Sequence, residues 1–408
     1  MNSRRLSRLD FGDPDFLADP YPMFHAERSR GPVTWHEETA RWLVVDHAVC
    51  SQALRDRRLG RIWHDRQPAE VYEPFNLLHR NQMMEHEPPD HTRLRRKVSA
   101  AFARGHVERM RPRVRELGRR LLDEIDTDHF DALADFAEPL PVLVIAELLG
   151  TPIDDVGLLR SWSQAIVRMY EPAVTTDVEV AALRASQEFA DYMRALIRSR
   201  RESPADAPGD DLLSDLLRAQ EGADGLTDDE VLASAILLLN AGHEASVNVF
   251  GNGLVALLGH PEQWRRLVDG GVDVALLVEE MLRFDSALQL FERTATAEVE
   301  LADVVVPPGD KVAVLLGAAN RDPHVFTEPD AMYADRDPNP HLAFGVGVHF
   351  CLGAPLARVE LAESLGLLVS TYPGLALAGQ PRRRPTFVLR GYESVQVSSG
   401  RPRRVTDE

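Results

Sequence analysis

Cysteine is nearly absent from this chain of 408 residues, which contains only Cys50 and Cys351. A disulfide framework is thereby excluded, because at most one pair could form. The polar first ten residues are not followed by an apolar run that could act as a signal or an anchor. We therefore expect a soluble, cytoplasmic protein that does not associate with a membrane.

Basic residues are fewer than acidic ones. The chain has 46 Lys and Arg residues against 64 Asp and Glu, a formal net charge of −18. This acidic balance argues against nucleic acid or an anionic membrane as the main partner. The sequence also has no Gly-x-Gly-x-x-Gly that follows a strand and opens a helix, so it carries no dinucleotide or flavin fingerprint.

Over most of the chain the apolar residues recur at helical spacing, so we expect a mainly α fold with small β-sheets. Short β-type runs at 32–36 and 41–45 flank a polar turn, and a second β pair is expected at 304–306 and 311–316. We interpret residues 1–408 as a single domain whose β-rich part covers roughly 30–60 and 290–320. Apolar residues recur at helical spacing over 94–125, 142–149, 178–200 and 273–284.

The clearest helix start is Thr227, which forms a capping box with Glu230. From Val231 to Gly259 the pattern stays apolar on nearly all faces, which predicts a long helix buried in the core. Polar residues in its middle, such as His243 and Glu244, are costly unless they are paired or used.

Cys351 is the residue most indicative of function. It lies in Phe344-Gly345-Val346-Gly347-Val348-His349-Phe350-Cys351-Leu352-Gly353, just before a helical run. The positive end of a helix dipole and nearby amides favour the thiolate, which is a metal ligand. A structural cysteine is the alternative for an isolated Cys-Leu-Gly. Zinc is disfavoured, because no second cysteine or close His pair completes a site.

This segment resembles the haem-binding signature of the cytochrome P-450 superfamily, and two further motifs fit that family. Glu280-Met281-Leu282-Arg283 matches its Glu-x-x-Arg pair, although alone such a pair is commonly a solvated ion pair. Arg336 matches its meander arginine. The resemblance implies that Cys351 binds the iron of haem b, between the long central helix and the cysteine loop. It also implies that Glu280, Arg283 and Arg336 clamp this loop.

The long helix resembles the oxygen-activating helix of that family, whose pattern is Ala-Gly-x-acid-Thr. Ala241, Gly242 and Glu244 match it, whereas Ala245 replaces the threonine. The resemblance implies that Gly242 lets oxygen lie against the helix and that Glu244, near solvent, relays protons. We expect Ser246, an ordered water or a substrate hydroxyl to replace the missing threonine hydroxyl. Some soluble bacterial macrolide hydroxylases share this alanine, which favours an oxygenated polyketide as substrate.

The resemblance also assigns ligand contacts. It places the haem propionates at His91, Arg95, Arg293 and His349, and it places Phe344, Gly345, Gly353 and Ala241 around the cofactor. It assigns substrate specificity to stretches that include 62–84 and 168–180, and among single residues to Leu238, His243, Leu288, Gln289, Leu290, Phe291 and Val388.

The implied activity is that of a haem-thiolate monooxygenase, which inserts one atom of O2 into a hydrophobic secondary metabolite by hydroxylation or epoxidation. Electrons are expected from a ferredoxin and its reductase. Between Arg93 and Arg120, eleven basic and two acidic residues give a net charge of +9, which is either a ferredoxin-docking face or a solvated basic one. A peroxide-driven or a coupling and rearranging enzyme remains an alternative, and a haem sensor without turnover a weaker one.

Overall fold

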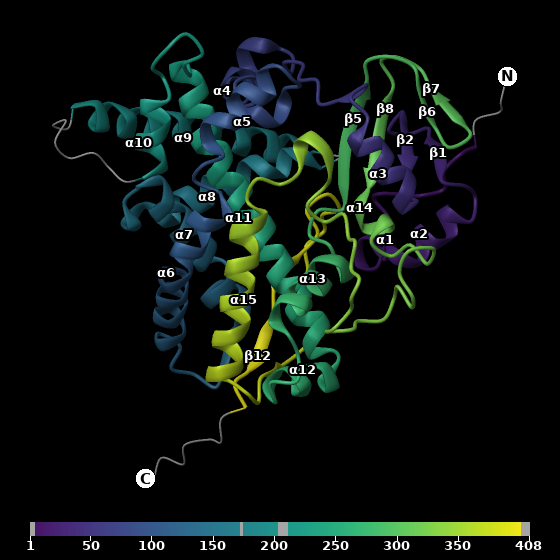
Figure 1. Cartoon of the computed structure of the whole chain (residues 1–408), viewed down its shortest axis with the longest axis vertical. Helices are drawn as coiled ribbons and strands as arrows, with labels where there is room; N and C mark the ends of the chain where they lie inside the picture. The colour runs from purple at the N-terminus through teal and green to yellow at the C-terminus, as the bar shows by residue number, and fades with distance from the viewer. Residues whose placement is uncertain (1–4, 172–173, 203–210, 401–408) are drawn as a thin grey trace.

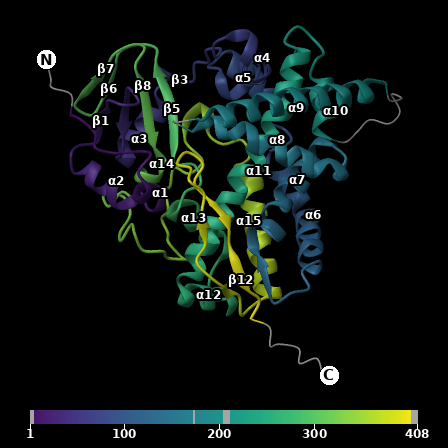
Figure 2. The same ribbon diagram turned by 180° about the vertical axis from the view of Figure 1, so that it is seen from behind.

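The computed structural model describes residues 5–171, 174–202 and 211–400. Helices make up most of this structure and surround α11 (Asp228–Leu258), while the main β-sheet lies at one edge (Figure 1). The view from behind shows the same arrangement (Figure 2). Residues 172–173, which belong to the stretch 168–180 expected to contact substrate, lie outside the described residues.

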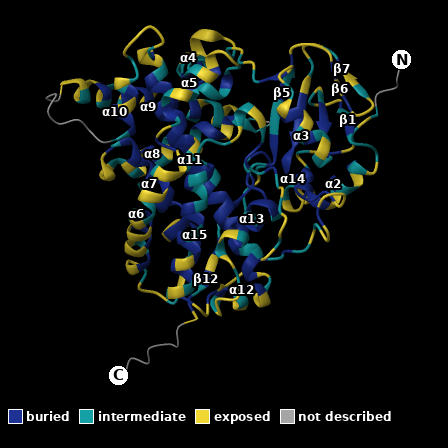
Figure 3. Ribbon diagram, viewed as in Figure 1, coloured by how far each residue is buried: buried dark blue, intermediate teal, exposed yellow. Residues whose placement is uncertain are grey.

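The central helix α11 has the length and burial that its sequence predicts. Thr227 accepts a hydrogen bond from the Glu230 N–H (3.2 Å), and Glu230 accepts one from the Thr227 N–H (2.9 Å), which confirms the capping box. The helix runs for 31 residues and is buried along most of its length (Figure 3). It packs against α7 (Pro139–Leu149), α8 (Val156–Val167), α13 (Val274–Phe284) and α15 (Ala354–Thr371).

The helical stretch expected over 94–125 is two helices, α5 (Asp90–Val98) and α6 (Arg104–Asp123). The turn between them buries Ala101 and Phe102, a tertiary gain that outweighs their helical propensity. The remaining α-helices are α1 (Pro14–Ala18), α2 (Tyr21–Arg28), α3 (His47–Arg55), α4 (Ala69–Arg80), α9 (Thr176–Glu202), α10 (Leu212–Arg218), α12 (Pro261–Val268) and α14 (Leu316–Ala319). Short helical turns are η1 (Met83–Glu85), η2 (Ala132–Ala137), η3 (Ile153–Asp155), η4 (Arg168–Tyr170) and η5 (Gly347–His349).

Five strands form the main sheet, in the order β1-β2-β8-β5-β3. They are β1 (Val33–His36), β2 (Arg41–Val44), β3 (Leu59–Gly60), β5 (Leu290–Ala295) and β8 (Lys311–Leu315). The β1-β2 hairpin is confirmed. The smaller sheets comprise β4 (His129–Asp131), β6 (Val299–Leu301), β7 (Val304–Val306), β9 (Ala376–Leu377), β10 (Arg382–Arg383), β11 (Tyr392–Ser394) and β12 (Gln396–Ser398).

The expected pairing of 304–306 with 311–316 is wrong. Strand β7 pairs with β6, whereas β8 lies between β2 and β5 in the main sheet. The physical reason is burial, since Val312 to Leu315 are all fully buried and such a strand needs neighbours on both edges. Among the described residues, no helix combines the length and the apolar character required to cross a membrane.

Candidate functional site

Cys351 lies in the loop between η5 and α15, where several groups converge on its sulfur. The backbone N–H groups of Gly353 and Ala354 donate hydrogen bonds to it, and Arg95 and Arg358 lie close enough to favour the thiolate. Burial is nevertheless the largest effect and raises the pKa of the Cys351 thiol. A cation bonded to the sulfur would offset this burial, so the loop suits a metal-bound thiolate.

Two glycines give the loop its shape. Gly345 and Gly347 have φ angles of 64° and 81°, in the left-handed region that favours glycine. A Cβ atom at Gly347 would lie 2.5 Å from the carbonyl oxygen of Leu54, so no side chain fits there. Phe344 precedes them, is 9% exposed and has the guanidinium of Arg358 over its ring at 4.6 Å.

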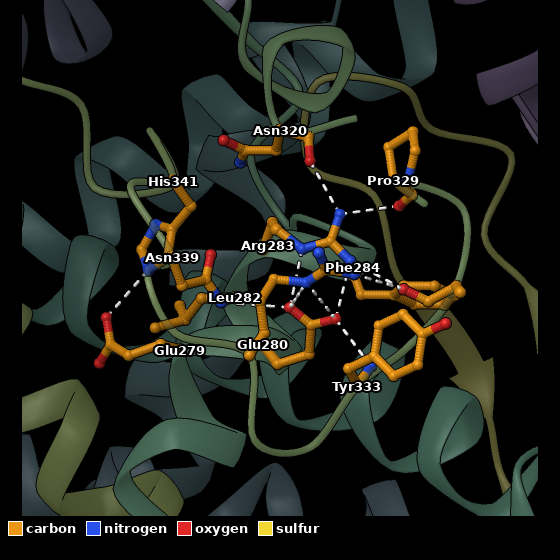
Figure 4. Close-up of polar contacts among 12 residues, drawn as sticks. Glu279, Glu280, Leu282, Arg283, Phe284, Asn320, Pro329, Tyr333, Asn339 and His341 are labelled. Carbon is orange, nitrogen blue, oxygen red and sulfur yellow. Dashed lines mark hydrogen bonds and ion pairs between the residues drawn. The ribbon is translucent and has the colours of Figure 1, made fainter. Parts of the chain in front are cut away.

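The Glu280, Arg283 and Arg336 side chains meet in the interior, as expected. Glu280 and Arg283 are fully buried and form two hydrogen bonds of 2.7 and 2.8 Å (Figure 4). Arg336 Nε lies 3.0 and 3.1 Å from the two carboxylate oxygens of Glu280. The carboxylate therefore serves both arginines.

This cluster also holds the chain that leads to the cysteine loop. Glu280 accepts hydrogen bonds from the Tyr333 N–H (2.9 Å) and from the Asn339 amide (3.1 Å). Arg283 donates to the carbonyl oxygens of Asn320 and Pro329 (Figure 4). The 320–339 segment is thus fastened to α13 shortly before the loop begins.

One face of α11 is accessible although the helix runs through the core. Ala241 is exposed and Ala245 is half-buried, while most of the helix is buried. These two residues are four positions apart and therefore share a side of the helix. Leu238, 6% exposed, lies nearly one turn earlier beside the same face. An accessible strip at the centre of the fold is consistent with a bound ligand.

His243 does not lie on this open face, whereas Gly242 is half-buried, as Ala245 is. A Cβ atom at Gly242 would lie 3.5 Å from the Ile145 side chain, so the glycine packs against α7. His243 is two positions after Ala241 and points to the opposite side of the helix. It is fully buried, its ring nitrogens have no hydrogen-bond partner among the described residues, and burial lowers its pKa to about 3. The structure therefore separates His243 from Ala241, and Gly242 lies between the open face and α7.

The Glu244 carboxylate is not near solvent, contrary to expectation. It is 4% exposed and accepts a hydrogen bond from Arg384 (3.2 Å), which also contacts Glu138 (3.3 Å). Burial raises the pKa of Glu244, and Arg384 opposes this shift. An arginine from the C-terminal part of the chain thus holds this carboxylate inside the protein.

Ser246 contacts a carboxyl group that the sequence analysis missed. Its hydroxyl is hydrogen-bonded to the side chain of Glu360 on α15, and burial raises the pKa of Glu360 to about 8. Both residues line, with Ser364, a cavity of about 10 Å³, which is room for about one water. The available sequence signal was an acid between two apolar residues, Val359 and Leu361, both of which are buried. Burying a carboxyl group costs free energy unless the group is hydrogen-bonded.

The residues expected to bind propionates come from three elements and lie near one another. His91 and His349 have ring centroids 4.5 Å apart, and Arg95 donates to the Phe350 carbonyl (2.7 Å). His349 is paired with Glu87, with 2.8 Å between Nε2 and Oε1. Burial lowers the pKa of His91 to about 4, with His349 and Arg95 contributing.

Arg293 is the most informative member of this group. It is 2% exposed, and it donates to the carbonyl of its neighbour Glu292 (2.8 Å). No carboxylate among residues 5–171, 174–202 and 211–400 forms an ion pair with it. Burial lowers the pKa of Arg293 to about 9. Glu87 and Glu85 lie near enough to favour its charge but form no ion pair with it. A buried guanidinium without an ion pair fits an anionic group supplied by a ligand.

The candidate substrate residues of β5 and its approach divide into two sets. Leu288 and Phe291 are half-buried, and Phe291 lies against Gly345 of the cysteine loop. Leu288 also bridges to Leu389, next to Val388, which is 7% exposed. Gln289 and Leu290 point into the fold instead. The amide of Gln289 donates to Ser286 O (2.6 Å), and Leu290 belongs to a buried hydrophobic cluster.

Comparison with known proteins identifies the family. The cytochrome P-450 family model matches residues 165–269 and 274–387, more than half of the chain. The chain is 38% identical over 405 residues to the cytochrome P-450 monooxygenase PikC of Streptomyces venezuelae, covering 95% of this chain and 94% of PikC. It is 37% identical to the 6-deoxyerythronolide B hydroxylase of Saccharopolyspora erythraea over 406 residues, 95% and 98% of the two chains.

A solved structure supports the same relationship. P-450 BioI, crystallised with an acyl carrier protein that bears hexadec-9Z-enoic acid, superposes with a TM-score of 0.89 at 32% identity, covering 94% of this chain and 99% of BioI. Shared fold, extensive identity and the cysteine loop agree. The chain therefore belongs to the cytochrome P-450 family of haem-thiolate monooxygenases.

Proposed function

We propose that this enzyme takes electrons from a ferredoxin and inserts one oxygen atom of O2 into a hydrophobic secondary metabolite, such as a macrolide or another polyketide. The observation that carries the site assignment is the convergence of donors on the Cys351 sulfur, together with the unpaired Arg293. The substrate class is supported by a relative named polyketide biosynthesis cytochrome P-450 PksS, of Bacillus subtilis, and the reaction by the 6-deoxyerythronolide B hydroxylase.

The residues of the site fit haem b. Cys351 would bind the iron, and Arg293, Arg95, His91 and His349 would hold the two propionates. Haem with a thiolate ligand supplies the reductive activation of O2. Ala241, which lies on the accessible face of α11, would border the porphyrin on one side, and Phe344, Gly345 and Gly353 would border it on the cysteine side.

Proton delivery is assigned first to Ser246 and Glu360. Because its pKa is about 8, Glu360 holds a proton at neutral pH and can pass it to the Ser246 hydroxyl or to a water beside them. This route would replace the hydroxyl that Ala245 lacks. Glu244 is a less direct donor, since Arg384 holds its carboxylate.

Coupling of electron consumption to product tests this route. Ser246→Ala should uncouple the enzyme, whereas Ser364→Ala, which changes another residue of the same small cavity, should leave coupling unchanged. Ala245→Thr should keep or improve coupling if Ser246 suffices. A sharp loss in Ala245→Thr would instead assign the proton path to a hydroxyl of the substrate.

The proposed substrate pocket is apolar, as a hydrophobic metabolite requires. Leu238, Leu288, Phe291 and Val388 would form its walls. His243 and Gln289 are weaker candidates, because both are fully buried, His243 on the far side of α11 and Gln289 within the fold. A redox partner would reach the protein from the cytoplasm at the basic surface of α5 and α6.

A carbon monoxide difference spectrum tests the core of the proposal. The reduced protein with CO should show the red-shifted Soret band of a thiolate-ligated haem, and Cys351→Ser should abolish it. Turnover of a polyketide panel with ferredoxin and reductase should then give products that contain one atom of labelled O2. Products formed only with hydrogen peroxide would favour the peroxide-driven alternative, which the absence of a hydroxyl at Ala245 keeps open.

A further inference from the structure

Glu171, which directly follows η4, makes an unusual contact with a distant part of the chain. Its carboxylate accepts hydrogen bonds from three consecutive backbone N–H groups. Oε2 accepts from Phe387 (2.9 Å) and Val388 (3.2 Å), and Oε1 accepts from Leu389 (3.3 Å). One side chain thus accepts hydrogen bonds from all three N–H groups of the 387–389 turn, which we call its amide edge.

The other sides of this turn are held by the sheet and by the N-terminal core. The Phe387 ring packs against Phe11 and Phe16, with centroid distances of 5.0 Å for both. The Val388 carbonyl accepts from the Gln289 N–H (3.0 Å), and Leu389 bridges to Leu288. The amide edge is therefore the part of the turn whose position depends on Glu171.

The partly buried Glu171 carboxylate has no positively charged partner among the described residues. Burial raises the pKa of Glu171, and only the three amide hydrogen bonds lower it. In the parts of the chain that the structure describes, no lysine, arginine or histidine pairs with this carboxylate. Burying an ionised carboxylate is unfavourable unless hydrogen-bond donors replace the lost water. The ionised Glu171 therefore favours the one position of the 387–389 turn in which all three N–H groups donate to it.

We propose that Glu171 is a positioning residue for substrate specificity, which clasps the 387–389 turn to the chain after η4 and thereby fixes the wall formed by Val388 and Leu288. The inference rests on the proposed function, because that function makes these two residues part of the substrate pocket. The structure ties together two segments, 168–171 and 387–389, that share no strand or helix.

Hydrogen exchange of the holoenzyme tests the clasp itself. Glu171→Ala should speed exchange of the amides of Phe387, Val388 and Leu389 at least tenfold, because their acceptor is gone, and Glu171→Gln should have a smaller effect. The matched control is Glu179→Ala, which removes the carboxylate that accepts from Tyr72 (2.9 Å) and should leave these amides unchanged. Unchanged exchange at 387–389 in Glu171→Ala would overturn the proposal.

Binding of two azoles tests the effect on specificity. The apparent Kd of clotrimazole, which is bulky enough to reach the pocket wall, should rise about tenfold in Glu171→Ala, or about 1.4 kcal/mol of binding free energy, because the released turn no longer holds Val388 in place against the ligand. The Kd of imidazole should stay unchanged. An equal shift for both azoles, or none for clotrimazole, would refute a role in specificity. Failure of the proposed haem site would differ, because the unaltered protein would then lack the CO band and bind neither azole.

Discussion

At the scale of a single residue, the Glu360 carboxyl group should make the free energy of unfolding depend on pH. Its pKa is about 8 in the folded protein, against an ordinary value of 4.5. Between these values the folded protein binds more protons than the unfolded one, so the free energy of unfolding falls as pH rises from about 4.5 to about 8. Above about pH 8, Glu360 is ionised in both states and lowers the free energy of unfolding no further.

Glu360→Gln should remove this pH dependence, because the amide does not ionise. The variant should therefore gain stability relative to the unaltered protein at pH 9, by at most about 5 kcal/mol, and should gain much less at pH 5. Urea unfolding at the two pH values measures the difference. Parallel pH profiles for the two proteins would contradict the environment assigned to Glu360.

Glu280 shows the opposite case of a carboxylate that is fully compensated. It is fully buried and serves two arginines and two groups of the 333–339 segment. Glu280→Gln should lower the free energy of unfolding by about 3–5 kcal/mol, because buried guanidinium groups lose their counter-charge. The exposed Glu262 on α12 is a matched control, and Glu262→Gln should change stability by less than about 0.5 kcal/mol. Comparable losses in the two variants would argue against the clamp.

Single residues were predictable where a motif fixes their spacing. Cys351, Glu280, Arg283 and Arg336 belong to such motifs, and the latter three meet as expected. The Arg384 contact with Glu244 could not be predicted, because it joins positions 140 residues apart through the packing of the C-terminal strands. A helical sequence states which face a side chain occupies, but not which distant side chain reaches it.

At the scale of an element, the N-terminus of α11 offers a direct test. Thr227→Ala removes the hydroxyl that accepts from the Glu230 N–H. Loss of this cap should lower the free energy of unfolding by about 1 kcal/mol, as measured by urea denaturation. The control is Thr92→Ala, an exposed position inside α5 where no cap is lost. If both variants lose the same stability, the capping box contributes nothing.

Elements were predicted more reliably than their pairing. The period of α11 and its capping box locate that helix within a few residues, because both signals are local. The partner of β8 is decided instead by which neighbours can cover a fully buried strand. The break between α5 and α6 likewise depends on the burial of Ala101 and Phe102 in the tertiary fold.

For the whole molecule, we propose that the chain folds as one domain, since the largest of three hydrophobic clusters joins residues from Phe75 to Val397 and Leu288 packs against both of the others. Its charge distribution is less simple than the net +9 of 93–120. Arg111 and Arg115 pair with Glu363, and Arg93 pairs with Glu230, so much of that charge is compensated. Within 93–120, the exposed arginines that form no ion pair with a described residue are Arg104, Arg109, Arg119 and Arg120.

The two ends of α6 differ in their distance from the cysteine loop. Arg111 contacts Glu363, and a Cβ atom at Gly118 would lie against Leu367, so α6 and α15 run side by side in the same direction. The first turn of α6, with Arg104, is therefore nearer to Cys351 than the last turn, with Arg120. If an acidic ferredoxin docks at the cysteine side, charge near Arg104 should matter more.

Charge reversal at the two ends separates docking from general electrostatics. Arg104→Glu should slow reduction by an acidic ferredoxin about tenfold at low ionic strength, because it places a like charge at the docking face. Arg120→Glu makes the same change in net charge and should slow it much less. Stopped-flow reduction under CO measures both rates, and they should converge in high salt, since screening removes the long-range attraction. Equal slowing by the two variants would mean that the ferredoxin senses only the overall charge of the protein and does not dock near Arg104.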